Sequence, residues 1–244
     1  MSGRFRRTKR ALAALIAGMA LALVAIFAIG GYFGRHAYAY EPASGGRSDG
    51  LVAVYWSGDM GMTIGLGRTI IDRLRADGIP VLTISSPVLF AQQRDLGFAG
   101  RTMAHALRLA LAQPGARRIA VVGSSFGSDM VVASLGQMPP ALRARIASVA
   151  LVGPGKDIYF HANPSGLFYR GPSAVDPAAA VPLMQGLPLT CIYGSSDDEA
   201  VCPQPAMVGA RQVRIEAGHM MLASHDLVAD KVLEALRRPP PAMR

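Results

Sequence analysis

The chain has 244 residues, a formal net charge of +9 at pH 7 and 51% hydrophobic residues. This length is enough for one domain with a full hydrophobic core, so a single globular domain is expected. The basic side chains are scattered and form no stripe interleaved with aromatic residues, which argues against a protein that binds nucleic acid.

The N-terminus carries a targeting or anchoring signal. Residues 1–10 form a basic head with five lysines and arginines and no acid, and residues 11–34 follow as an uncharged run of 24 residues. Such a run can cross a hydrocarbon layer about 30 Å thick. Because basic residues before an apolar span stay in the cytoplasm, the rest of the chain is expected in the periplasm. Without the head, 20 lysines and arginines face 16 acidic residues, a net charge of +4.

Two interpretations of this segment remain open. A signal peptide would be cleaved after the A-x-A sequence Ala37–Ala39. The apolar run is longer than the ~7–15 residues of a usual signal-peptide core, which favours an uncleaved anchor that binds the inner membrane through residues 11–34. Residues 35–50 then read as a linker rich in Pro, Gly and Ser, residues 51–238 as the domain and residues 239–244 as a tail.

Short apolar runs alternate with helical patterns through the predicted domain. Most of the runs are uninterrupted, as expected for strands buried on both faces of a parallel sheet. The expected strands are Leu51–Trp56, Val81–Ile84, Ile119–Val122, Val149–Val152, Leu189–Tyr193 and Gln212–Ile215. The expected helices lie within residues 66–74, 103–111, 130–135 and 228–236. The alternation predicts an α/β fold with a mostly parallel sheet of about six strands and right-handed crossovers.

One long segment, Gly153–Gly186, departs from this alternation and is rich in Pro, Gly and Ala. A loop of this length inside a compact domain is usually functional. We expect it beside the carboxyl edge of the sheet, as a lid or a substrate-binding insertion.

The sequence Gly123-Ser124-Ser125-Phe126-Gly127 joins an expected strand to an expected helix. A G-x-S-x-G sequence in this setting is typical of a nucleophile elbow. Glycines are needed there because the turn is too tight for a Cβ atom, and the turn lifts the serine hydroxyl above the sheet. Ser125 is therefore the candidate nucleophile.

A serine nucleophile needs a base and an acid, which follow it in the order acid, then histidine, in proteins with this motif. Acidic residues Asp197, Asp198 and Glu199 follow the fifth expected strand, and His219 follows the sixth. All lie at carboxyl ends of parallel strands, where such sheets place their sites. We assign His219 as the base and Asp198 as the acid, with Asp197 as its close competitor.

Acyl transfer also needs donors for the oxyanion. One is expected from the backbone N–H of Phe126, the residue after the nucleophile. The other is expected from Asp59 or Met60, in the glycine-bearing turn Ser57–Gly61 after the first strand. Asp59, Asp129 and Glu199 lie on the same predicted loops, where their carboxylates can receive a cationic substrate group.

The two cysteines, Cys191 and Cys202, bracket a short loop. An even count in an oxidising compartment favours a disulfide over two free thiols. Two cysteines without nearby histidines do not form a metal-ligand set, so no metal or other cofactor is expected.

These motifs together resemble the VirJ/AcvB bacterial virulence proteins across residues 51–236. The resemblance rests on the elbow, on Pro139–Arg145, on the stretch from Cys191 to Cys202-Pro203 and on Gly218-His219. It implies a periplasmic α/β-hydrolase-like three-layer domain. The glycine turn departs from the Gly-Asp-Gly-Gly-Trp usual in the family, since this chain has Gly58-Asp59-Met60-Gly61-Met62.

The resemblance also implies two kinds of function. AcvB-like members hydrolyse lysyl-phosphatidylglycerol, and VirJ-like members are tied to type IV secretion and virulence. With the residues above, it predicts a serine esterase that acts on the ester of an aminoacylated phospholipid. The alternatives are a general carboxylesterase and a non-catalytic module that binds envelope or secretion proteins.

Overall fold

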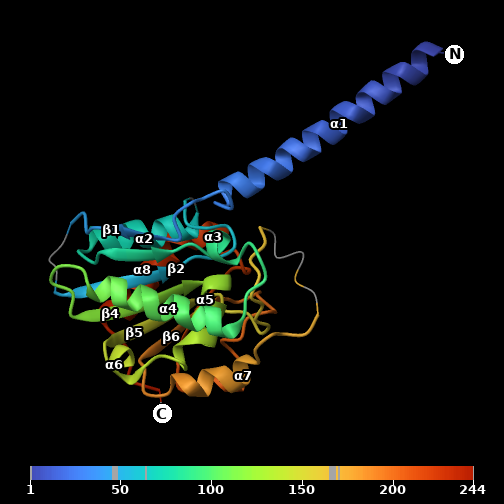
Figure 1. The fold of residues 1–244 in the computed structure, drawn as a ribbon. Coiled ribbons are helices and arrows are strands. Elements are labelled where there is room, and N and C mark those ends of the chain that lie inside the picture. Colours follow the sequence, from blue (N-terminus) through green and yellow to red (C-terminus); the bar gives the residue numbers. More distant parts are fainter. Residues whose placement is uncertain (1, 46–48, 64, 165–168, 170, 244) are drawn as a thin grey trace.

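A seven-stranded sheet runs through the body of the protein in the computed structural model, which describes residues 2–45, 49–63, 65–164, 169 and 171–243 (Figure 1). The strands are β1 (Tyr38–Glu41), β2 (Leu51–Trp56), β3 (Val81–Ile84), β4 (Arg118–Ser124), β5 (Ile146–Val152), β6 (Leu189–Gly194) and β7 (Arg211–Ile215). Their order in the sheet is β1-β3-β2-β4-β5-β6-β7. All neighbours pair in parallel except β1, which is antiparallel to β3.

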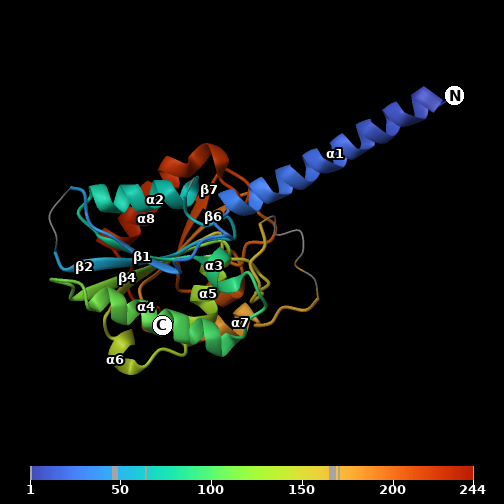
Figure 2. The same cartoon turned by 45° about the horizontal axis from the view of Figure 1, so that its top comes forward.

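Helices cover both faces of the sheet (Figure 2). On one face lie α2 (Leu66–Ala76) and α8 (His225–Arg237), and on the other lie α4 (Leu96–Leu111) and α5 (Phe126–Leu135). The short helices are α3 (Ser86–Phe90), α6 (Pro140–Arg143), α7 (Pro177–Ala180), η1 (Val181–Met184), η2 (Pro205–Met207) and η3 (Leu222–Ser224). The three-layer α/β fold predicted from the sequence is therefore confirmed.

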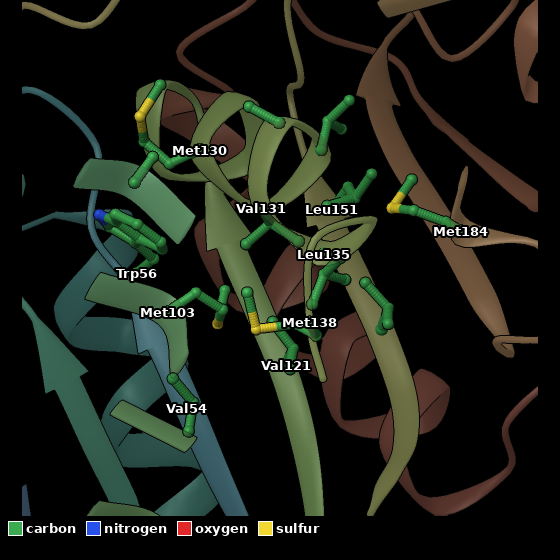
Figure 3. Packing of buried hydrophobic residues seen from close by; sticks show 14 of the residues in the cluster. Val54, Trp56, Met103, Val121, Met130, Val131, Leu135, Met138, Leu151 and Met184 are labelled. Carbon is green, nitrogen blue, oxygen red and sulfur yellow. The ribbon is translucent and has the colours of Figure 1, made fainter. Parts of the chain in front are cut away.

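The central strand β2 shows how the two hydrophobic layers form. Val54 and Trp56 pack into the layer beneath α4 and α5, together with Met103 and Met130 (Figure 3). The alternate residues, including Tyr55, pack into the layer beneath α2 and α8. All of β2 is thus buried although its side chains alternate between faces. Burying each large apolar side chain contributes about 1.5–3 kcal/mol.

The strand order reverses beside β2, and this reversal positions the site. From β2 the chain crosses to β3 on one side and then returns to β4 on the other. In open α/β sheets, ligands bind at the carboxyl ends of the strands where the order reverses. The turns that follow β2 and β4 meet there.

Residues 35–50 contain an element that the sequence does not predict. They include β1, an edge strand whose register pairs Tyr38 with Ile84 and Glu41 with Val81. The ring of Tyr38 also contacts His105 of α4, with ring centroids 5.0 Å apart. Part of the predicted linker is therefore sheet. Residues 46–48 of that linker, and residues 165–168 and 170 of the predicted lid, lie outside the described residues.

The N-terminal helix α1 (Ser2–Ile29) projects away from the body (Figure 1). Its stretch Lys9–Ile29 has 21 residues and contains an 18-residue window with a mean hydropathy of 2.8 and no buried residue, so it is long and apolar enough to cross a membrane. By length and composition it fits an anchor or a signal sequence. The apolar run predicted over residues 11–34 is thus divided, because the helix ends at Ile29 and residues 30–34 form a turn against the body.

The predicted disulfide between Cys191 and Cys202 is present. It joins the middle of β6 to the far end of the loop that follows this strand, and both cysteines are fully buried. A disulfide is typical of proteins that fold outside the cytoplasm.

Replacing both cysteines with alanine is expected to lower the melting temperature. The bond closes a loop with a sequence separation of 11 residues, so its loss costs about 2–3 kcal/mol, or about 5–10 °C for a domain of this size. Thermal melting of the detergent-solubilised chain measures the change. Wild-type protein melted with reductant is the control, and equal melting temperatures in all three samples would contradict the prediction.

Candidate active site

Ser125 lies in a strained turn between β4 and α5. Its backbone has φ 48° and ψ −122°, a conformation that non-glycine residues rarely adopt. The flanking glycines permit this turn: a Cβ on Gly123 would lie 2.6 Å from the Cα of Ser128, and one on Gly127 would overlap the carbonyl oxygen of Trp56. Residues 123–127 thus have the geometry expected of a nucleophile elbow.

Ser125 is the first member of a hydrogen-bonded chain of three side chains. Its Oγ lies 3.0 Å from Nε2 of His219, and Nδ1 of His219 lies 2.7 Å from Oδ2 of Asp197. When Nδ1 donates to the carboxylate, Nε2 is left to accept the serine proton. The arrangement has the distances that a general base needs.

The carboxylate that bonds His219 belongs to Asp197. The prediction from the sequence that Asp198 is this acid is therefore wrong. The Asp197 side chain is only 4% exposed, and its second oxygen, Oδ1, accepts a hydrogen bond from the backbone N–H of Glu199. This local turn aims Oδ2 at the imidazole. Asp198, the next residue along the turn, is exposed to solvent.

Backbone hydrogen bonds join the loop that carries the acid to the loop that carries the base. The N–H groups of Ser195 and Ser196 donate to the carbonyl oxygens of Ile215 and Ala217, at 2.7 and 3.0 Å. Gly153, directly after β5, lies against the imidazole of His219. A Cβ on Gly153 would lie 3.5 Å from Cε1 of His219. The imidazole is therefore held between three strand ends.

The turn after β2 lies directly beside the nucleophile. A Cβ on Gly58 would lie 3.2 Å from the carbonyl oxygen of Ser124 and 3.5 Å from Cβ of Ser125. Gly61 N–H donates to the Gly58 carbonyl, which leaves Asp59 and Met60 at the tip of a tight turn. Phe126 begins α5, where the first N–H groups have no partner within the helix. The turn that holds Asp59 and Met60 and the start of α5 thus both lie beside Ser125.

The carboxyl group of Asp59 forms a partly buried polar cluster with the lid segment. The hydroxyl of Tyr169 donates to both oxygens of Asp59, at 2.8 Å each, and the backbone N–H of Asn163 donates as well. Burial nevertheless raises the pKa of Asp59 to about 7. The side-chain amide of Asn163 is buried with no partner among the described residues.

The two predicted substrate-binding acids lie in different environments. Asp129, in the first turn of α5, accepts a hydrogen bond from the N–H of Gly155 at 2.8 Å, and burial together with the charges of nearby acids, including Asp59, raises its pKa well above the ordinary value. Glu199 is exposed and pairs with Lys156 at 3.0 Å. Asp129 therefore belongs with Asp59 at the site, whereas Glu199 is already neutralised at the surface.

Titratable side chains in the described part of the chain form no group of three His, Cys, Asp or Glu that could hold a metal ion. Tyr169 and Asn163 are functional candidates that the sequence does not predict. Both come from the lid segment, in which neither a motif nor a spacing marks individual residues.

Comparison with known families identifies the chain. The family described as bacterial virulence protein (VirJ) matches this sequence over residues 50–239. The chain belongs to the VirJ family. The matched range includes the whole hydrogen-bonded chain from Ser125 to Asp197 and His219, and it excludes α1. Comparison with curated proteins gives no match.

Several solved structures share the fold of this VirJ-family domain. Est1E from Butyrivibrio proteoclasticus superposes with a TM-score of 0.63 at 12% identity, covering 82% of this chain and 92% of its own. MenH from S. aureus gives a TM-score of 0.60 at 13% identity, covering 83% and 98%. The esterase domain of a Rhodothermus marinus protein gives 0.55 at 14% identity, covering 82% and 92%. At these identities the likeness establishes the α/β-hydrolase fold.

Proposed function

We propose that this VirJ-family protein is a serine hydrolase that cleaves an acyl ester, with Ser125, His219 and Asp197 as its catalytic residues. The observation that carries the proposal is the unbroken hydrogen-bonded chain from the Ser125 hydroxyl to the buried Asp197 carboxylate. A strained, glycine-flanked serine at a strand end supports it, because such strain persists only where the surrounding structure enforces it.

The chemistry follows from these positions. Ser125 Oγ attacks the ester carbonyl carbon while its proton passes to His219 Nε2, and Asp197 stabilises the imidazolium. Backbone N–H groups of Phe126 and of the turn Gly58–Gly61 receive the oxyanion. The alcohol leaves with the proton from His219, and the acyl group stays on Ser125. A water molecule, deprotonated by His219, then releases the acid and restores the serine.

We further propose that the preferred substrate is the ester of an aminoacylated phospholipid of the lysyl-phosphatidylglycerol type. Asp59 and Asp129 place two carboxyl groups beside the elbow, each with a pKa raised by burial. A bound ammonium group favours their ionised forms and so recovers part of the cost of burying them. A neutral acyl chain would gain nothing from these groups.

Fluorophosphonate labelling and lipid hydrolysis test these two proposals. Purified wild-type protein is expected to label at one serine and to release lysine from lysyl-phosphatidylglycerol in mixed micelles. Ser125→Ala is expected to do neither, and the neighbouring Ser124→Ala is the matched control for labelling. Labelling without lysine release would support the alternative function of a general carboxylesterase. No labelling at all would leave the non-catalytic binding role.

The preference for a lysine ester is expected to rise with pH. With a folded-state pKa of about 7, Asp59 is mostly protonated at pH 6 and mostly ionised at pH 8. The ratio of KM for an Nα-acetyl-lysine ester to KM for the matched norleucine ester should therefore fall about five- to tenfold over this range. The ratio removes any effect of pH that is common to both substrates. Asp59→Asn should abolish the trend, and an unchanged trend in that variant would contradict the assignment.

We infer that α1 stays attached and holds the body on the periplasmic face of the inner membrane. Cleavage after Ala39 would remove the first half of β1, including Tyr38 and its contact with His105. The disulfide is consistent with an oxidising compartment. Mass spectrometry of the membrane fraction is expected to find a chain that still contains α1 and has an intact bond between Ala39 and Tyr40. A chain that begins at Tyr40 would refute retention of the anchor.

A further inference from the structure

The turn that follows the membrane helix lies against the candidate active site. We call residues 30–34 the juxtamembrane turn. A Cβ on Gly61 would lie 2.8 Å from the carbonyl oxygen of Gly30, and one on Gly34 would lie 3.0 Å from Cγ2 of Val88 in α3. The carbonyl group of Gly30 therefore lies closer to Gly61 than a side chain at that position would allow.

Tyr32 is the side chain that the juxtamembrane turn brings to this place. It is half-buried, and its ring contacts Phe27 of α1 with ring centroids 5.0 Å apart. Its hydroxyl lies near enough to Asp59 for the carboxylate charge to act on it. The same hydroxyl is buried and has no hydrogen-bond partner among the described residues.

A buried phenol without a partner is costly, because its hydrogen bonds to water are lost and not replaced. A phenylalanine would fill the same space without this cost. The Asn163 amide, whose backbone N–H bonds the same Asp59, is a second buried polar group without a partner in the described part of the chain. Two such groups around one carboxyl group point to a ligand that supplies the missing hydrogen bonds.

We propose that the juxtamembrane turn is part of the active site and that the hydroxyl of Tyr32 binds the substrate beside Asp59. The membrane anchor then contributes a substrate-binding residue as well as a tether. This assignment rests on the proposed hydrolase function for its substrate. Its structural half, the packing of the juxtamembrane turn against α3, stands independently of that function.

Three variants of the full-length chain in detergent test the role of Tyr32. Tyr32→Phe keeps the ring and removes only the hydroxyl, and Phe33→Ala is the control in the same turn, because Phe33 is 66% exposed. Tyr32→Phe is expected to raise KM for the Nα-acetyl-lysine ester about tenfold with kcat within about twofold, as for the loss of one hydrogen bond to a charged group. KM for the norleucine ester should stay unchanged, and Tyr32→Ala should impair both esters.

A purely structural role gives different results. If Tyr32→Phe matches wild type on the lysine ester, or impairs both esters equally, the substrate role is refuted. If wild type labels with fluorophosphonate but hydrolyses no lysine ester, the role of Tyr32 fails while the hydrolase proposal stands. If wild type does not label, the proposed function itself fails, and the packing is then decided by cross-linking.

Cross-linking tests the packing without any activity. Gly34→Cys combined with Val88→Cys is expected to form a disulfide in membranes, since both native cysteines are already paired. Phe33→Cys with Val88→Cys is the control, and we expect it to cross-link at least about tenfold more slowly because the Phe33 side chain faces solvent. Equal rates for the two pairs, or no cross-link in either, would overturn the proposal.

Discussion

Replacing Asp197 with asparagine is expected to lower kcat for ester hydrolysis by about 10⁴-fold. The amide can donate to Nδ1 of His219, which stabilises the tautomer whose Nε2 carries a proton. That tautomer cannot accept the proton of Ser125, and the imidazolium loses its counter-charge. KM should change little, because Asp197 lies behind the imidazole, 2.7 Å from Nδ1.

Asp198→Asn is the matched control for this experiment. The residue is adjacent, has the same side chain and is exposed to solvent, so kcat should stay within about twofold of wild type. The two variants together decide which acid serves His219. A large loss in Asp198→Asn with a small loss in Asp197→Asn would show that the acid loop rearranges when substrate binds.

Replacing Gly127 with alanine is expected to abolish the native fold around the elbow. The added Cβ would overlap the Trp56 carbonyl and lie 2.6 Å from the carbonyl oxygen of Ser57. Both are backbone atoms of the central strand and the turn after it, so neither can move aside. We expect a loss of more than about 3 kcal/mol in the free energy of unfolding. Chemical denaturation measures it, and fluorophosphonate labelling should disappear.

Gly218→Ala is the control for the glycine experiment. Gly218 lies next to His219, yet a Cβ there would meet nothing within 4 Å. Its unfolding free energy should stay within about 0.5 kcal/mol of wild type. A tolerated Gly127→Ala would mean that the approach of α5 to β2 is looser than the structure has it.

The predicted strands agree with the structure because most of them are uninterrupted apolar runs. Leu51–Trp56 and Val81–Ile84 have the predicted bounds, and the remaining predicted strands differ from the structure by one to three residues at an end. Helix α4 begins before Met103, the first residue of the helix that the apolar spacing predicts. Its start at Leu96 depends on Asp95, whose carboxylate caps the N–H of Phe98.

Strand β1 could not be predicted from its own residues. The sequence Tyr38–Glu41 is short, partly exposed and polar at its end, so it has neither an apolar run nor a full alternation. It becomes a strand because the edge of β3 offers unpaired backbone groups. Such tertiary pairing leaves no local signal in the sequence.

The candidate site was only partly predictable for a related reason. Ser125 and His219 follow strands and have turn glycines beside them, so their positions could be placed at one sheet edge. Asp197 and Asp198 are adjacent identical residues. Their roles differ because Oδ1 of Asp197 accepts the N–H of Glu199, which directs Oδ2 of Asp197 toward His219. Tyr169 bonds Asp59 from a segment far away in sequence, and Tyr32 lies near enough for the Asp59 charge to act on it. No spacing rule connects these residues.

The order of the three hydrogen-bonded side chains along the polypeptide has a consequence for biogenesis. Ser125 comes first, Asp197 next and His219 last, at position 219 of 244. If the chain emerges from a translocation channel with its N-terminal helix already held in the bilayer, the serine is exported well before its base. Under the proposed function, the nascent polypeptide would then lack its catalytic base, and stay chemically inert toward the surrounding lipids, until His219 has also crossed.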